Sequence, residues 1–165
     1  MFNLFLVVFS KSPNPKKVEI PKMKFKINPK ENKNSKIFNQ ILNELKGNRL
    51  IELNLENKNI SNKDFKQFIS SLSKASNIKI INLKGNQIND KIIDSLFSNI
   101  KYLKIETLNL SSNKLSPIFF SHLRKFKKTN IYLKNVHIAD NDISVNIMSK
   151  KFLEFKKMGL NLIIK

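Results

Sequence analysis

Apolar residues recur in one short pattern at four points along the chain. Each copy carries apolar residues at its first, fourth and sixth places, as Ile78, Ile81 and Leu83 do. Alternating apolar positions over so short a run predict a strand with one buried face. Successive copies begin 28, 27 and 28 residues apart, at Leu50, Ile78, Ile105 and Leu133.

A second pattern follows each predicted strand. The last three copies have an asparagine at the ninth place, Asn86, Asn113 and Asn141, where its side chain can bond the turning backbone. Further apolar residues recur at helical spacing after this turn. The helix starts are marked by N-cap candidates, Asn89 or Asp90 in one unit and Ser116 before Pro117 in the next. Each unit is therefore predicted to be a strand, a turn and an amphipathic helix.

Less regular copies flank these four. Phe25 and Ile27 stand at the fourth and sixth places of an earlier unit, and Leu160 to Ile164 is predicted as a last strand. Lysine replaces the ninth-place asparagine in two units, at Lys30 and Lys58. We expect a repeat domain of about five units over residues 22–165, with its last strand at 160–164.

The whole pattern, L-x-x-L-x-L-x-x-N-x-L, resembles the leucine-rich repeat family. A period of 27–28 residues with a full helix is similar to the ribonuclease-inhibitor type of that family. The resemblance implies an α/β fold, a short solenoid with parallel β-strands on the concave face and α-helices on the convex face. It also implies an interaction module rather than an enzyme, because members mostly bind other proteins on the concave face.

Residues 1–21 precede the repeats. Met1 to Phe9 is an apolar run of nine residues, which is well below the ~18 residues needed to span a bilayer. We expect a strand or an apolar cap on the domain, followed by a linker at Pro13 and Pro15. A weak secretory signal segment is the alternative, although no basic residue opens it and the cleavage match after it is loose.

Side chains between the buried strand positions should project from the concave face, because side chains alternate across a strand. We expect the partner-binding residues at the third, fifth and seventh places: Glu52, Asn54, Glu56, Ile80, Asn82, Lys84, Thr107, Asn109 and His137. This surface is polar and nearly balanced in charge. Mutual hydrogen bonding between neighbouring amides is the alternative role for its asparagines.

The helical side of the predicted solenoid differs from the concave face in its charge. The chain has 31 Lys+Arg against 12 Asp+Glu, a formal net charge of +19. The basic residues of the helical face include Lys74, Lys101, Lys128, Lys151 and Lys156. They complement helix dipoles, or they form a surface for anionic membrane or nucleic acid. Codon bias of an AT-rich genome is a third source of the lysine excess.

Several kinds of chemistry are excluded. The chain has no cysteine, hence no disulfide and no thiolate site. Its three glycines are far apart, so no phosphate-binding loop can form. His122 and His137 lack hydrolase partners at a known spacing, and Asp140 and Asp142 are typical turn residues. We expect no catalysis, no cofactor, no metal site and no small-molecule substrate.

The first functional hypothesis is a protein–protein interaction module. The alternatives are a basic surface binder of anionic membrane or nucleic acid through the helical face, and a secreted or host-delivered effector. Self-association through the last strand is a further expectation, because an uncovered strand edge can pair with another chain. A cytoplasmic location is favoured over secretion, because a glycan at the acceptor Asn109-Leu-Ser111 would block the concave face.

Overall fold

The computed structural model describes residues 51–60, 62–73 and 76–164. The predictions for residues 1–21, for the early unit at 22–50 and for Lys74 lie outside these ranges. Nine elements alternate along the described chain: β1 (Glu52–Asn54), α2 (Asn62–Leu72), β2 (Ile80–Asn82), α3 (Asp90–Ile100), β3 (Thr107–Asn109), α4 (Phe119–Thr129), β4 (Asn135–His137), α5 (Val145–Lys157) and β5 (Asn161–Ile163).

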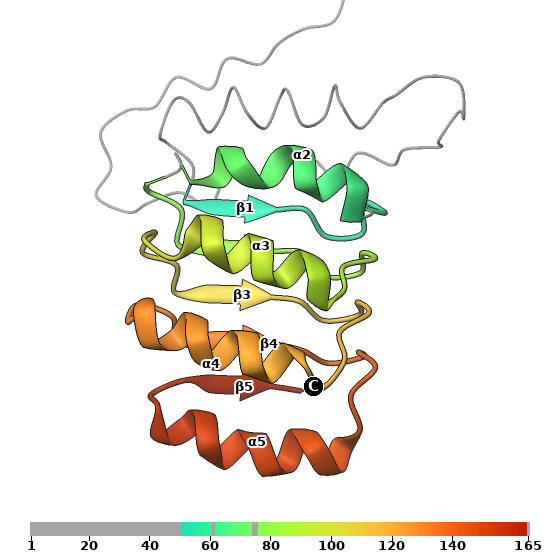
Figure 1. Cartoon of the computed structure of the whole chain (residues 1–165), viewed down its shortest axis with the longest axis vertical. Helices are drawn as coiled ribbons and strands as arrows, with labels where there is room; N and C mark the ends of the chain where they lie inside the picture. Colours follow the sequence, from blue (N-terminus) through green and yellow to red (C-terminus); the bar gives the residue numbers. More distant parts are fainter. Residues whose placement is uncertain (1–50, 61, 74–75, 165) are drawn as a thin grey trace, which may run out of the picture.

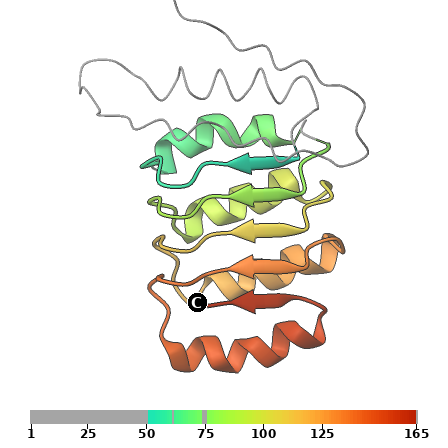
Figure 2. The ribbon, with the colours of Figure 1, turned by 180° about the vertical axis from the view of Figure 1, so that it is seen from behind.

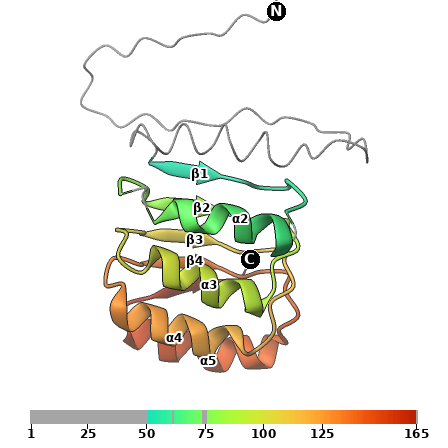
Figure 3. The same ribbon diagram turned by 45° about the horizontal axis from the view of Figure 1, so that its top comes forward.

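The five strands form one parallel sheet in the order β1-β2-β3-β4-β5. The helices lie together along one face of this sheet (Figure 1), and α2, α3 and α4 follow one another in the same direction (Figure 3). The view from behind shows strands in front of α3 and α4, while α5 is seen below β5 at the end of the stack (Figure 2). The predicted α/β solenoid is thereby confirmed. We call the sheet surface opposite the helices the strand face.

The core lies between the sheet and the helices and is built from the repeating apolar places. The fourth-place residues are fully or almost fully buried in every described strand: Leu53, Ile81, Leu108, Val136 and Leu162. On the helical side, Phe97 of α3 stacks on Phe126 of α4 with ring centroids 4.3 Å apart. Successive units are therefore joined by packing as well as by strand pairing.

The last strand lies within its predicted range of residues 160–164. β5 covers Asn161–Ile163, and Asn135 of β4 pairs with Asn161. Leu160 is buried just before the strand. The step between the paired residues Asn135 and Asn161 is 26 residues, which is one or two residues shorter than the other steps of the register. β5 stands last in the sheet order, and self-association through it stays a prediction.

The turn after each of the first four strands contains a residue with positive φ at the eighth place of the repeat. These residues are Asn57 (φ 53), Gly85 (φ 67), Ser112 (φ 54) and Asp140 (φ 52). The left-handed region costs most residues energy, and glycine, asparagine and aspartate enter it most easily. The turn is thus the same in every unit although its residue type changes.

Replacing Gly85 with alanine should destabilise the fold more than the same change at Gly159. Both residues have φ near +70, Gly85 at +67 and Gly159 at +69. A Cβ at position 85 would stand 1.8 Å from Asn57 Oδ1, whereas nothing lies within 4 Å of one at position 159. We expect Gly159→Ala to cost about 1 kcal/mol for backbone strain, and Gly85→Ala to cost up to about 2 kcal/mol because the exposed side chain of Asn57 must also move aside. Urea unfolding of both variants measures the difference, and equal losses would contradict the predicted clash.

Candidate functional site

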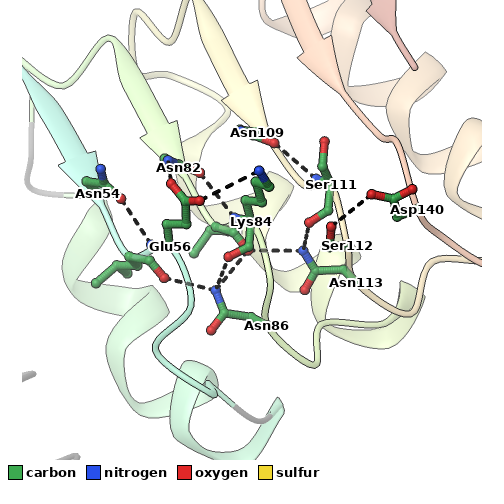
Figure 4. Close-up of polar contacts among 12 residues, drawn as sticks. Asn54, Glu56, Asn82, Lys84, Asn86, Asn109, Ser111, Ser112, Asn113 and Asp140 are labelled. Atoms are coloured by element: carbon green, nitrogen blue, oxygen red, sulfur yellow. Dashed lines mark hydrogen bonds and ion pairs between the residues drawn. The ribbon is translucent and has the colours of Figure 1, made fainter. Parts of the chain in front are cut away.

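The strand face brings the fifth-place side chains together in one row. The register pairs Asn54 with Asn82, Asn82 with Asn109, and Asn109 with His137. All four side chains are half-buried. Because parallel strands align their residues, the row runs across the sheet from β1 to β4 (Figure 4 shows its three amides).

Each amide of this row is held by its own strand. The Oδ1 atoms of Asn54, Asn82 and Asn109 accept hydrogen bonds from the backbone N–H two residues further on, at 3.0, 3.1 and 3.1 Å. This bond fixes the amide plane and leaves the NH₂ group as the outward donor. Asn82 donates through Nδ2 to Glu56 at 3.2 Å. Among the described residues, the NH₂ group of Asn109 has no acceptor. The row is therefore a set of oriented donors.

In the third-place row, neighbouring side chains hydrogen-bond one another, which is the alternative role expected for the asparagines. Asn161 Nδ2 donates to Asn135 Oδ1 at 3.1 Å, and Asn135 Nδ2 donates to Thr107 Oγ1 at 3.4 Å. Ile80 is half-buried in the same row. Glu52, which was expected to project from this face, is only 8% exposed. It is therefore less accessible to a partner than the sequence indicated.

The seventh-place row carries compensating charges. Glu56 and Lys84 form an ion pair at 3.7 Å, across β1 and β2 (Figure 4). Ser111 and Ala139 continue the row and are buried. The strand face thus has little net charge, as its sequence indicated, and recognition on it rests on hydrogen bonds more than on charge.

The ninth-place asparagines lie beneath the turns and bond backbone only. The Oδ1 atom of Asn86, Asn113 and Asn141 accepts the N–H of the eleventh place of the preceding unit. Each Nδ2 donates to three carbonyl oxygens, one in the preceding unit and two in its own. These side chains join neighbouring turns and are not offered to a partner.

The two histidines stand in different surroundings. His122 Nδ1 lies 3.1 Å from Asp94 Oδ1 on the helical side. His137 continues the fifth-place row, and burial lowers its pKa. Asp140 accepts a hydrogen bond from Ser112 Oγ at 3.2 Å, in the turn where the sequence placed it. Within residues 51–60, 62–73 and 76–164, no three of the His, Asp and Glu side chains group as metal ligands do.

Replacing His137 with asparagine should make stability less sensitive to acid. The pKa of His137 is lower in the folded chain than in the unfolded chain, so the folded state binds fewer protons. Its contribution to stability is present above the unfolded pKa of about 6.5 and is lost as the pH falls. Asparagine occupies this place in three other units and should fit. Urea unfolding at about pH 7 and pH 5 should show a smaller decrease for His137→Asn than for the parent chain. Equal decreases would contradict the assignment.

Of the four described lysines that we expected on the helical face, three lie at helix ends. Lys101 follows α3 as its C-cap, and Lys128 and Lys156 lie in the last turns of α4 and α5. Lys151, however, is paired with Glu154 at 2.9 Å. Lys151 and Arg124, both bonded to Glu154, hold the pKa of that carboxyl below its usual range. Lys151 is therefore less available to an anionic partner than Lys128 and Lys156, which are exposed at the helix ends.

Sequence reasoning missed two polar side chains at these helix ends. Asn130 is 1% exposed, accepts from Leu133 N–H at 3.1 Å and donates to the Leu103 carbonyl at 2.7 Å. Lys127 Nζ donates to the carbonyls of Ile131 and Leu133, and burial lowers its pKa. The sequence signal for Asn130 was an asparagine three residues before the apolar residue at the first place of the unit. It does not recur in the other described units.

Three comparisons relate this chain to known proteins. A family model described as Leucine Rich repeat matches residues 74–97. FERM domain-containing protein C of Dictyostelium discoideum is 29% identical over 99 residues, which cover 59% of this chain and 7% of that protein. The chain thus spans only a small part of the length of this curated relative.

Two solved structures have a similar fold. Leiomodin-1 Actin-Binding Site 2 superposes with a TM-score of 0.63 at 21% identity, over 78% of this chain and 79% of that one. The tropomodulin C-terminal domain of Caenorhabditis elegans superposes with a TM-score of 0.64 at 19% identity, over 78% and 82%. The repeating sequence pattern, the parallel strand–helix units and the matched family model agree on a leucine-rich repeat fold for this chain.

Proposed function

We propose that this chain binds a protein partner through the strand face and has no catalytic role. The observation that carries the proposal is the row of oriented amides at Asn54, Asn82 and Asn109. Their positions are fixed before a partner arrives, so binding costs little side-chain entropy. Amide NH₂ groups in such a row can donate to the carbonyl oxygens or carboxylates of an extended segment of a partner.

The charge of this surface also supports the proposal. Glu56 and Lys84 compensate each other, so a partner need not be strongly acidic or basic to approach. Affinity should then depend on hydrogen bonds and shape, and moderate salt should change it little.

Actin is the first partner to test. One of the solved structures with this fold is titled as an actin-binding site of leiomodin-1. At 21% identity this likeness supports the fold rather than the partner. Actin is therefore a specific candidate within the broader proposal of protein binding.

A pair of charge-matched double variants tests the binding face. Asn82→Lys/Asn109→Lys places two bulky cations on the strand face, and Ser98→Lys/Ser121→Lys places two on exposed positions of α3 and α4. Proximity labelling and pull-down at two salt concentrations identify the partner, with purified actin assayed in parallel. We expect the first pair to abolish partner recovery and the second to leave it within about twofold. Equal recovery with both pairs would contradict binding on the strand face.

A cytoplasmic location is part of this proposal. Asn109 lies in the acceptor sequence Asn109-Leu-Ser111 and belongs to the amide row. A glycan there would cover the row. Within the described ranges, none of the helices combines the length and apolar character needed to cross a membrane. Recovery of a form glycosylated at Asn109 that still binds the partner would contradict the placement of the site.

A further inference from the structure

A second surface lies where each helix ends and the next strand begins. We call it the basic edge and define it as Lys79 with residues 101–106, 127–134 and 156–159. It lies on the left of the molecule in Figure 1 and on the right in Figure 2, because all strands begin on the same side. Its lysines are Lys79, Lys101, Lys104, Lys127, Lys128, Lys134, Lys156 and Lys157.

The basic edge has almost no negative charge. Its one carboxylate is Glu106, which pairs with Lys134 at 3.1 Å and with Lys79 at 3.2 Å. These two lysines hold the pKa of Glu106 below its usual range. The opposite edge, where strands end and helices begin, carries Asp90, Asp140 and Asp142 beside lysines such as Lys91 and Lys114. The lysine excess is therefore concentrated on one side of the described solenoid.

Apolar side chains project from the same edge. Tyr102 is 84% exposed, Ile131 is 73% exposed and Tyr132 is 42% exposed. Lys101 Nζ lies 4.8 Å from the ring centre of Tyr102, and Lys104 Nζ lies 5.8 Å from that of Tyr132. The apolar tips and the cations thus form one mixed patch over the loops after α3 and α4.

The loops that carry these tips are internally fixed. Asn130, which is buried, bonds both Leu133 N–H in its own loop and the Leu103 carbonyl in the preceding loop. Lys127 bonds the carbonyls of Ile131 and Leu133. The side chains of Asn130 and Lys127 therefore hydrogen-bond the backbone of this loop, while Ile131 and Tyr132 point outward. Nothing in the described fold requires these two side chains to be apolar.

We propose that the basic edge docks on the surface of an anionic lipid bilayer. Tyrosine is enriched at the membrane interface, and lysine can keep its ammonium at headgroup level while its stem lies along apolar surface. Lysines near an anionic surface are attracted to it, and salt weakens this attraction. The exposed Ile131 and the absence of arginine from this edge favour lipid over nucleic acid, since arginine is the side chain best suited to phosphate and base recognition. This surface is separate from the strand face.

Vesicle co-sedimentation tests the proposal with the full chain. Vesicles of phosphatidylcholine are compared with vesicles that also contain about one third phosphatidylserine, at low and moderate salt. Lys104→Glu/Lys128→Glu reverses two exposed lysines of the basic edge. Lys91→Glu/Lys114→Glu makes the same change of charge at exposed positions of the opposite edge. We expect binding only to the anionic vesicles, at least about tenfold weaker for the first pair and within about twofold of the parent for the second.

A tryptophan probe tests insertion of the apolar tip. The chain has no tryptophan, so Ile131→Trp introduces a single reporter on the basic edge. Ile118→Trp is the matched control, because Ile118 is 61% exposed at the start of α4 on the opposite edge. Anionic vesicles should shift the emission of the first variant to shorter wavelength and leave that of the second unchanged.

Several results would overturn the proposal. These are no binding to anionic vesicles, equal losses for the two lysine pairs, and no emission shift for Ile131→Trp. Displacement of the protein from vesicles by a short single-stranded oligonucleotide, with stronger binding to that oligonucleotide, would assign the edge to nucleic acid instead. Asn82→Lys/Asn109→Lys should keep vesicle binding, so failure of the strand-face proposal and failure of this one are distinguishable.

Discussion

Replacing Asn113 with alanine should lower the free energy of unfolding by about 3 kcal/mol or more, because one buried side chain satisfies four backbone groups. Asn113 Oδ1 accepts from Ile88 N–H at 3.1 Å, and its Nδ2 donates to the carbonyls of Leu83, Leu110 and Ser111 at 3.0 Å each. Alanine leaves these groups without that partner in a site that water does not fill easily. Urea unfolding followed by circular dichroism measures the loss.

Asn146→Ala is the matched control for this change. Asn146 is exposed in the first turn of α5, so the same atoms are removed without emptying a buried site. We expect a change within about 0.5 kcal/mol. A loss at Asn113 as small as the loss at Asn146 would show that the turns are held by strand pairing and packing alone. Asn141→Ala, at the equivalent place, should resemble Asn113→Ala.

The repeating places were predictable because they obey physical rules that act within a unit. A buried strand needs apolar residues at alternate places, and a turn that leaves it needs a side chain able to bond backbone. Leu53, Ile81, Leu108 and Val136 are buried for the first reason, and Asn86 and Asn113 bond the turns for the second. The order and direction of the strands then follow, since neighbouring units stack.

Features that depend on contacts between units were harder to predict. The positive φ at the eighth place is shared by Asn57, Gly85, Ser112 and Asp140, four different residue types, so composition carries no common signal. The Glu56–Lys84 pair requires the register of two strands as well as the face of each side chain. Glu52 was expected to be open to a partner and is buried.

The lysine excess illustrates the same limit. The sequence indicated cations at helix ends, and Lys101, Lys128 and Lys156 lie there. It did not distinguish Lys151, which is paired with Glu154, from these three residues. Nor did it indicate that Tyr102 and Ile131 would project beside them, because loop residues have no periodicity from which exposure can be inferred.

Replacing Asn130 with alanine should cost about 2–3 kcal/mol of unfolding free energy, because this buried amide links two successive loops. It accepts from Leu133 N–H and donates to the Leu103 carbonyl in the unit before. Among the described residues it is the most deeply buried polar side chain of the basic edge. Asn99→Ala is the control, since Asn99 bonds only the Ser95 carbonyl of its own helix, and alanine favours helix. We expect that change to stay within about 0.5 kcal/mol.

The same variant connects stability with the proposed membrane contact. Asn130 holds the backbone on either side of the exposed Ile131 and Tyr132, so its removal should loosen the tip without changing any charge of the basic edge. Binding of Asn130→Ala to anionic vesicles, measured well below its unfolding temperature, should weaken while its salt dependence keeps the parent slope. A steeper or shallower slope would mean that the loops position the lysines rather than the apolar tip.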